Sequence, residues 1–193
     1  MTESISRMAG VAGKHDFGMP SGWVCRFAKG LADGSRVLDL ACGRGRHARW
    51  LADRGCRVTA ADRDPATLAA IASHSGVTAC ELDLESGAAW PWPDAAFDAI
   101  VVTNYLHRPG FDRLGALLGP GGVLIYETFM LGNAAFGKPS NPDFLLMPGE
   151  LLERARDGFT VIAFEQGEIA RPAPAMVQRI CARKGDAPGR LPD

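Results

Sequence analysis

The sequence predicts an α/β fold in which helices cover both faces of a mostly parallel β-sheet. Residues 37–40 form an apolar run typical of a strand buried on both faces, and a glycine loop and a helix-like stretch follow it. Apolar runs and helix-like stretches keep alternating along the chain, which is the pattern of parallel strands joined by crossover helices. Two apolar runs near the C-terminus, 159–166 and 176–183, predict a pair of antiparallel strands that closes the sheet.

The predicted elements follow one another with short connections. Asp64 is a suitable N-cap residue, and Pro65 fits the first position of the helix that follows. Gly55 is a suitable C-cap residue for the helix before it. We expect strands at 37–40, 57–61, 77–82, 96–103, 119–129, 159–166 and 176–183, and helices at 21–31, 47–54, 65–73, 111–118 and 148–157.

The 193 residues suit one domain with a substantial core. We expect a single domain over 21–184, a flexible N-terminal segment over 1–20 and a loose tail over 185–193. Residues 127–150 are rich in glycine, proline and asparagine and also carry aromatic residues. Long irregular loops in compact domains are usually functional, so this stretch is interpreted as a lid-like insertion over the substrate.

Composition excludes several classes of protein. The net charge of −1 does not favour nucleic acid as a partner. The five cysteines form no Cys-x-x-Cys pair, which argues against a disulfide framework and against a bound metal, and favours a reducing, cytoplasmic location. No apolar stretch is long enough to cross a membrane.

Two carboxylates indicate the kind of ligand that the glycine loop binds. Asp39 lies at the end of the first strand, before Gly43 and Gly45, where it would repel a pyrophosphate but suit a cationic amine or sulfonium. Asp62 ends the second strand, where an acid can accept hydrogen bonds from ribose hydroxyls. Together they describe a nucleoside with a ribose, a positive charge and no phosphate, and S-adenosylmethionine fits that description.

The stretch DLACGRG resembles the D/E-x-x-x-G-x-G motif of class I S-adenosylmethionine-dependent methyltransferases, and Asp62 matches the ribose-binding acid of that family. The resemblance covers roughly residues 23–184. It implies a three-layer Rossmann-like fold with strand order 3-2-1-4-5-7-6 and an antiparallel last strand. It also implies S-adenosylmethionine as cofactor, with Asp83 and Leu84 at the adenine. The full set of expected cofactor-binding residues is Asp39, Ala41, Gly43, Gly45, His47, Asp62, Arg63, Asp83, Leu84, Thr103 and Asn104.

The last third of the chain is similar to the C-terminal region of the tellurite-resistance (TehB-like) type of these enzymes. That type carries a histidine and an arginine after a Gly-Glu turn, where this chain has Ala170 and Arg171. The resemblance implies a role for Arg171 at the acceptor. The missing histidine puts the oxyanion chemistry of that type in doubt for this chain.

The acceptor is predicted to be a small molecule that takes the methyl group by in-line displacement. His107 is the candidate base or orienting group because it follows the fourth strand, although a histidine bonded to loop backbone fits the sequence equally well. Tyr105 is a candidate for the methyl pocket. Two alternatives stay open: a non-catalytic regulatory protein that binds S-adenosylmethionine, and a less favoured nicotinamide-dependent oxidoreductase. The chain is expected to be a monomer or a homodimer.

Overall fold

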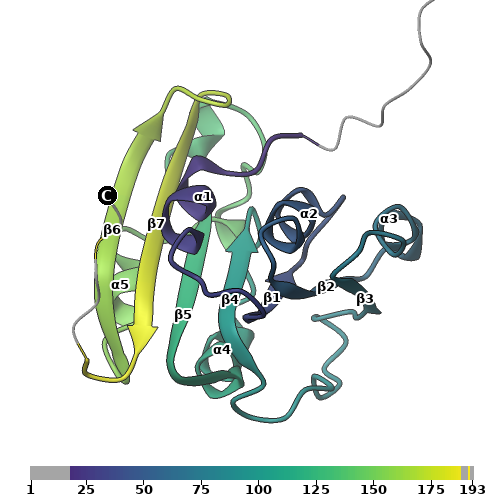
Figure 1. Cartoon of the computed structure of the whole chain (residues 1–193). Helices are drawn as coiled ribbons and strands as arrows, with labels where there is room; N and C mark the ends of the chain where they lie inside the picture. The colour runs from purple at the N-terminus through teal and green to yellow at the C-terminus, as the bar shows by residue number, and fades with distance from the viewer. Residues whose placement is uncertain (1–17, 188–190, 192–193) are drawn as a thin grey trace, which may run out of the picture.

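A computed structural model describes residues 18–187 and 191 of the chain. Its seven strands form one sheet in the order β3-β2-β1-β4-β5-β7-β6, and β7 runs antiparallel to both of its neighbours (Figure 1). The predicted strand order is therefore confirmed. The strands are β1 (Arg36–Leu40), β2 (Arg57–Asp62), β3 (Val77–Glu81), β4 (Phe97–Thr103), β5 (Leu118–Phe129), β6 (Phe159–Ile169) and β7 (Ala175–Lys184).

Helices cover both faces of this sheet. The first three α-helices, α1 (Gly22–Ala28), α2 (Arg46–Ala52) and α3 (Pro65–Ala69), pack on one face, and α4 (Phe111–Leu117) and α5 (Glu150–Arg154) pack on the other. Successive residues of a strand point to opposite faces. Accordingly Val37 packs with the α1–α3 layer, and Leu38 packs with the α4–α5 layer. The central strands are therefore apolar at nearly every position.

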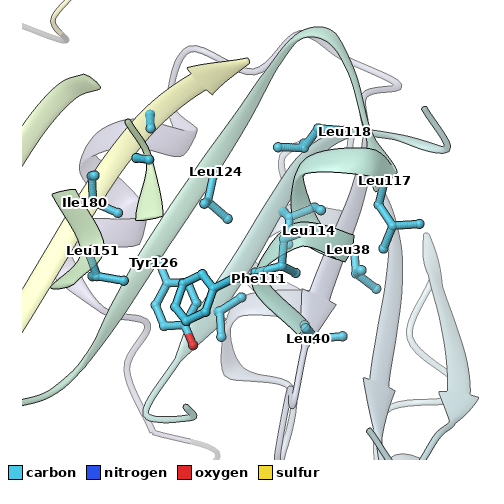
Figure 2. Packing of buried hydrophobic residues seen from close by; sticks show 14 of the residues in the cluster. Leu38, Leu40, Phe111, Leu114, Leu117, Leu118, Leu124, Tyr126, Leu151 and Ile180 are labelled. Carbon is cyan, nitrogen blue, oxygen red and sulfur yellow. The ribbon is translucent and has the colours of Figure 1, made fainter. Parts of the chain in front are cut away.

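The core on the α4–α5 face is built from leucines around a pair of aromatic rings. Figure 2 shows Phe111 and Tyr126 lying face to face, with ring centroids 5.4 Å apart. The Tyr126 hydroxyl donates a hydrogen bond of 2.8 Å to the backbone oxygen of Tyr105, so its polar end is satisfied inside the core. This bond ties the loop after β4 to the middle of the sheet.

On the other face, α1 joins the beginning of the described chain to its last strand. Ser21 caps the helix, because its hydroxyl accepts a hydrogen bond from the backbone N–H of Trp23. The Trp23 ring is buried, and its Nε1–H donates to the backbone oxygen of Ile180 at 3.3 Å. α1 therefore stands against β5 and β7, beside the edge where the parallel strands end.

Several predicted boundaries differ from the structure. The helix expected over 65–73 ends at Ala69, because the following N–H groups bond three residues back, as in Ile71 to Leu68, and form turns. The helices expected over 21–31 and 148–157 are also shorter, at Gly22–Ala28 and Glu150–Arg154.

The segment predicted as a lid over 127–150 begins inside β5, since Glu127, Thr128 and Phe129 pair with β7. The rest of this segment is held down by Asn133, whose side chain bonds to the backbone of Pro139 and Met176. Of the other predicted segments, residues 1–17, 188–190 and 192–193 lie outside the described residues. Within the described part of the chain, no helix is long and apolar enough to cross a membrane.

Candidate active site

The loop between β1 and α2 has a backbone that only small residues allow. Gly43 and Gly45 have φ angles of 51° and 70°, and Ala41 has a φ of 53°. A Cβ on Gly45 would lie 2.7 Å from Cγ2 of Ile71, whereas a Cβ on Gly43 would meet nothing within 4 Å. Gly45 is therefore required by packing, and Gly43 faces open space at the surface of the loop.

Asp39 is a buried carboxylate without a partner. It is 1% exposed, and among the described residues neither of its oxygens makes a hydrogen bond. Burial raises its pKa to about 7. The Ala48 backbone and the charge of Arg46 lower the pKa in part, and the negative charge of Asp62 adds to the rise. Buried charged groups normally have partners, and an unsatisfied one in a native structure is a typical sign of a binding site. A positively charged ligand is the group that would stabilise this carboxylate.

Asp62 stands at the end of β2, beside the glycine loop. Its Oδ2 accepts the backbone N–H of Gly43 at 2.8 Å, and its Oδ1 accepts that of Asp64 at 3.1 Å. The side chain is half-buried, while Arg63 next to it is exposed. The sequence places Asp62 correctly at the carboxyl end of its strand, and the bond to Gly43 fixes its carboxylate against the loop.

Asp83 and Leu84 follow the neighbouring strand β3. Asp83 is exposed and accepts the backbone N–H of Glu85 at 3.0 Å, while Leu84 is buried in the core. Because β3, β2 and β1 are adjacent and parallel, Asp83, Asp62 and Asp39 follow the same edge of the sheet. This arrangement is the one expected for an extended nucleoside that lies across the strand ends.

His47 is fully buried and links α2 to the segment before α1. Its Nε2 accepts the backbone N–H of Ser21 at 3.0 Å, and its Nδ1 lies 3.5 Å from the hydroxyl of Thr103. Burial lowers the pKa of His47 to about 3, with the charge of Arg46 contributing, so the ring is neutral. Both ring nitrogens face protein groups, and His47 positions Ser21 in this structure.

Cys42, inside the glycine loop, is also buried. Burial raises the pKa of its thiol, and the carboxylates of Asp39 and Asp62 raise it further. The thiol therefore stays protonated at neutral pH and is not a nucleophile.

A cavity of about 720 Å³ opens beside this loop, between α1, the end of β5 and the β6–β7 hairpin. Arg46 and Asn104 lie on the side toward the glycine loop, so the cavity begins where the predicted cofactor site ends. Its apolar walls include Trp23, Phe129, Phe136, Ile169 and Val177.

A network of paired charges forms one wall of the cavity. Glu127 is buried at the end of β5, where its carboxylate accepts the Ser21 hydroxyl at 2.7 Å and an Arg179 N–H at 3.1 Å. Arg179 also pairs with Glu165 at 2.7 Å, and its guanidinium lies 5.0 Å from the centre of the Trp23 ring. Each group in this wall is satisfied by another, which holds the wall rigid.

The three predicted catalytic residues differ in their relation to the cavity. Arg171 lines the cavity, but Tyr105 and His107 are not among the described residues that line it. The Tyr105 hydroxyl donates to Glu85 at 3.2 Å, and the ring of His107 lies 6.3 Å from that of Tyr105 and 6.5 Å from that of Trp90. His107 therefore lies in a cluster of aromatic rings with Tyr105 and Trp90.

Sequence reasoning did not find Arg179 or the cavity-facing role of Ser21. Arg179 lies within a strand and pairs with a glutamate 52 positions earlier, so no local signal marks it. Glu127 carries a weak signal, because it lies near the carboxyl end of a predicted strand, where ligands bind in such sheets.

Comparisons with known proteins agree with this geometry. Residues 37–122 match the protein family described as "Methyltransferase domain". The chain is 34% identical over 110 residues to the ubiquinone biosynthesis O-methyltransferase of Methylocella silvestris, covering 53% of this chain and 43% of that one. It is 38% identical over 106 residues to the trans-aconitate 2-methyltransferase of Streptomyces avermitilis, covering 50% and 39%. The chain thus spans about half the length of the curated relatives that it matches.

Among solved structures, TehB from Haemophilus influenzae has a similar fold. The TM-score is 0.70 at 20% sequence identity, and the match covers 86% of this chain and 62% of that one. At this identity the likeness shows the fold alone, so the finer TehB-like resemblance stays a prediction.

The fold and the site define an α/β protein with a glycine loop and three acids along the carboxyl edge of a seven-stranded sheet. Residues 37–122 match the methyltransferase-domain family, and the curated relatives that the chain resembles over about half of their length are methyltransferases by name.

Proposed function

We propose that the chain is an S-adenosylmethionine-dependent methyltransferase that acts on a small molecule. The observation that carries this proposal is the buried, unpartnered carboxylate of Asp39 at the glycine loop. It fits a ligand with a positive charge and disfavours the pyrophosphate of a nicotinamide cofactor. The matched relatives are methyltransferases by name, and one of them, by its name, acts on trans-aconitate.

The residues have separate tasks in this proposal. Asp39 stabilises the positive charge of the cofactor, Asp62 accepts hydrogen bonds from ribose hydroxyls, and the open surface at Gly43 lets the backbone approach the ligand. Asp83 and Leu84 flank the adenine. The remaining predicted contacts, Ala41, Gly45, His47, Arg63, Thr103 and Asn104, shape the loop or line its rim.

When bound, S-adenosylmethionine supplies an electrophilic methyl group on a sulfonium. The chain contributes alignment and exclusion of water, which suffice when the acceptor is already a good nucleophile. Asn104 and Arg46 border both the loop and the cavity, so the acceptor enters from the cavity side. Tyr105 and His107 lie outside the cavity, so we assign them to the support of the strand-end loop. Arg171 keeps its proposed role at the acceptor.

The proposed enzyme acts in the cytoplasm as a monomer or a homodimer, on neither nucleic acid nor a membrane. The net charge of −1 and the five free cysteines support this setting. Size-exclusion chromatography with light scattering measures the oligomeric state directly.

Calorimetric titration with S-adenosylmethionine, S-adenosylhomocysteine and NADH tests the cofactor. We expect both adenosyl ligands to bind and NADH not to bind. Asp62→Ala should weaken adenosyl binding by about ten- to a hundredfold, because hydrogen bonds to a charged carboxylate are lost.

Asp64→Ala is the matched control for that variant. Asp64 lies two residues away and caps α3 by accepting the backbone N–H of Ala66 at 3.0 Å. Its loss should lower stability but leave adenosyl binding unchanged. Binding of NADH alone, or equal adenosyl affinity of Asp62→Ala and the unmodified chain, would overturn the proposal.

A further inference from the structure

The cavity beside the glycine loop is lined by an excess of basic side chains, although the chain as a whole has a small negative net charge. Five basic side chains line it, Arg26, Arg46, Lys138, Arg171 and Arg179, against two acidic ones, Glu127 and Glu165. The whole chain has a net charge of −1. The excess of positive charge is therefore local to this cavity, and it favours a negatively charged occupant.

The two acidic side chains are already neutralised within the wall. Arg179 pairs with both Glu127 and Glu165, and Arg26 approaches Glu165 at 3.7 Å. Neither carboxylate is available as the main partner of a cationic ligand. The wall thus supplies shape and rigidity, and the remaining basic groups determine the charge preference of the cavity.

Within residues 18–187 and 191, Lys138 and Arg171 are the basic groups of the cavity whose side chains have no partner. They come from two different segments, the loop after β5 and the turn between β6 and β7, and both line the cavity. Among the described residues, no hydrogen bond, ion pair or ring contact involves either side chain. Both are exposed and therefore free to bind an anion that enters the cavity.

The volume and the walls of the cavity indicate the size of the occupant and the chemistry of its uncharged part. A volume of about 720 Å³ suits an organic molecule of drug-like size, and an inorganic oxyanion would leave most of it empty. Phe129, Phe136 and Ile169 offer apolar and aromatic surface, and Phe136 is 37% exposed. Burial of this surface by an apolar body would stabilise the complex.

We infer that the cavity binds an organic acid as the methyl acceptor, with its anionic group against Arg171 and Lys138 and its apolar body against Phe129 and Phe136. The inference rests on the proposed function and names its substrate class. In this transfer a carboxylate oxygen would form a bond to the methyl carbon, the bond from that carbon to the sulfonium sulfur would break, and S-adenosylhomocysteine would leave with a methyl ester as the other product. No proton moves, so an ionised acid needs no general base, and no histidine is among the described residues that line the cavity.

The test uses a pair of probes that differ in charge. 4-Phenylbutyrate and 4-phenylbutanamide have the same aromatic body, but only the first is anionic, and inorganic phosphate represents a small oxyanion. Dissociation constants are measured by ligand-observed NMR on the full chain with S-adenosylhomocysteine present. We expect the carboxylate to bind at least about fivefold more tightly than the amide, and phosphate to bind more weakly than the carboxylate.

Two variants test whether the preference for the carboxylate comes from the cavity cations: Arg171→Gln and Lys138→Gln. Arg156→Gln is the control. Arg156 is an exposed arginine that does not line the cavity. Each cavity variant should weaken 4-phenylbutyrate binding by about three- to tenfold and change amide binding less than twofold, a modest effect because the two cations are exposed. The control should change neither.

Each contrary outcome identifies what has failed. Four outcomes would each overturn this inference. The carboxylate binds no more tightly than the amide, the carboxylate does not bind, phosphate binds more tightly than the carboxylate, or both cavity variants keep the carboxylate affinity of the unmodified chain. If S-adenosylhomocysteine binds the unmodified chain in those experiments, the proposed function stands without it. If S-adenosylhomocysteine does not bind, the proposed function fails, and the carboxylate comparison without it still decides the charge preference of the cavity.

Discussion

The two halves of the carboxyl edge are built in different ways. The glycine-loop half, from Asp39 to Gly45 together with Asp62, depends on backbone turns and on one carboxylate that has no partner. The cavity half depends on side chains that satisfy one another, such as Glu127 and Arg179. The first half is a short sequence with a special backbone, and the second joins residues from distant parts of the chain. The contrast predicts that single substitutions act differently in the two halves.

Gly45→Ala should have the largest effect. The new Cβ would meet Cγ2 of Ile71 at 2.7 Å while the backbone keeps a φ of 70°. We expect a loss of about 2–4 kcal/mol in the free energy of unfolding, measured by urea denaturation. Gly34→Ala is the matched control, because its φ is 77° but a Cβ there meets nothing within 4 Å. It should lose about 1 kcal/mol. Equal losses would show that close packing does not set the shape of the loop.

Asp39→Asn should have the next largest effect, on cofactor binding and on pH dependence. We expect the variant to bind S-adenosylmethionine at least about tenfold more weakly at pH 8, since an uncharged amide no longer stabilises a cation. Calorimetric titration measures this loss. A variant with unchanged affinity would show that the buried carboxylate does not contact the cofactor.

The pH dependence of the same variant gives a second measurement. The folded-state pKa of Asp39, about 7, is raised above its ordinary value of 3.8, so between these values the folded state holds a proton that the unfolded state has released. The stability that Asp39 contributes is therefore full below about pH 4 and is lost as the pH rises toward 7. Urea denaturation of both proteins from pH 5 to 8 should show the unmodified chain losing stability relative to Asp39→Asn up to about pH 7. A constant difference would contradict the raised pKa.

Ser21→Ala should have the smallest effect, although Ser21 touches both halves. Its hydroxyl caps α1 and donates to Glu127, and both interactions are lost, while its backbone N–H still bonds to His47. We expect a loss of about 1 kcal/mol, measured by thermal and urea denaturation. Ser35→Ala removes a single exposed bond to the backbone oxygen of Ala32 and should change stability by less than half of that amount. If Ser21→Ala lowered the free energy of unfolding as much as Gly45→Ala, the two halves would not differ in their response to single substitutions.

The sequence predicts the glycine-loop half well, for a physical reason. Asp39, the glycines and Asp62 lie within 24 positions of one another, and strand ends and turns are determined by nearby residues. The strand order also follows from the resemblance to a family and is confirmed. Helix ends are less well predicted, as in α3, because turns of similar local energy compete with the last helical turn.

The cavity half is hardly visible in the sequence. Position at a strand end does not tell toward which side a side chain points. The sequence therefore could not show that the ring of His107 lies beside those of Tyr105 and Trp90. Ser21 and Glu127 are 106 positions apart, and Arg179 lies in the middle of a strand. Such pairs are determined by the register of the sheet, which becomes known only with the fold.

The hydrogen bond between Trp23 and Ile180 has a consequence for the order of assembly during synthesis. A ribosome releases the strands β1 to β4 and the glycine loop well before it releases β7, which lies between β5 and β6 in the sheet. α1 is among the first described elements to emerge, yet Ile180 and Arg179, which contact its Trp23 ring, lie on β7, the last described strand. The glycine-loop half can therefore form on a nascent chain, whereas the cavity is complete only after the β6–β7 hairpin has joined the sheet.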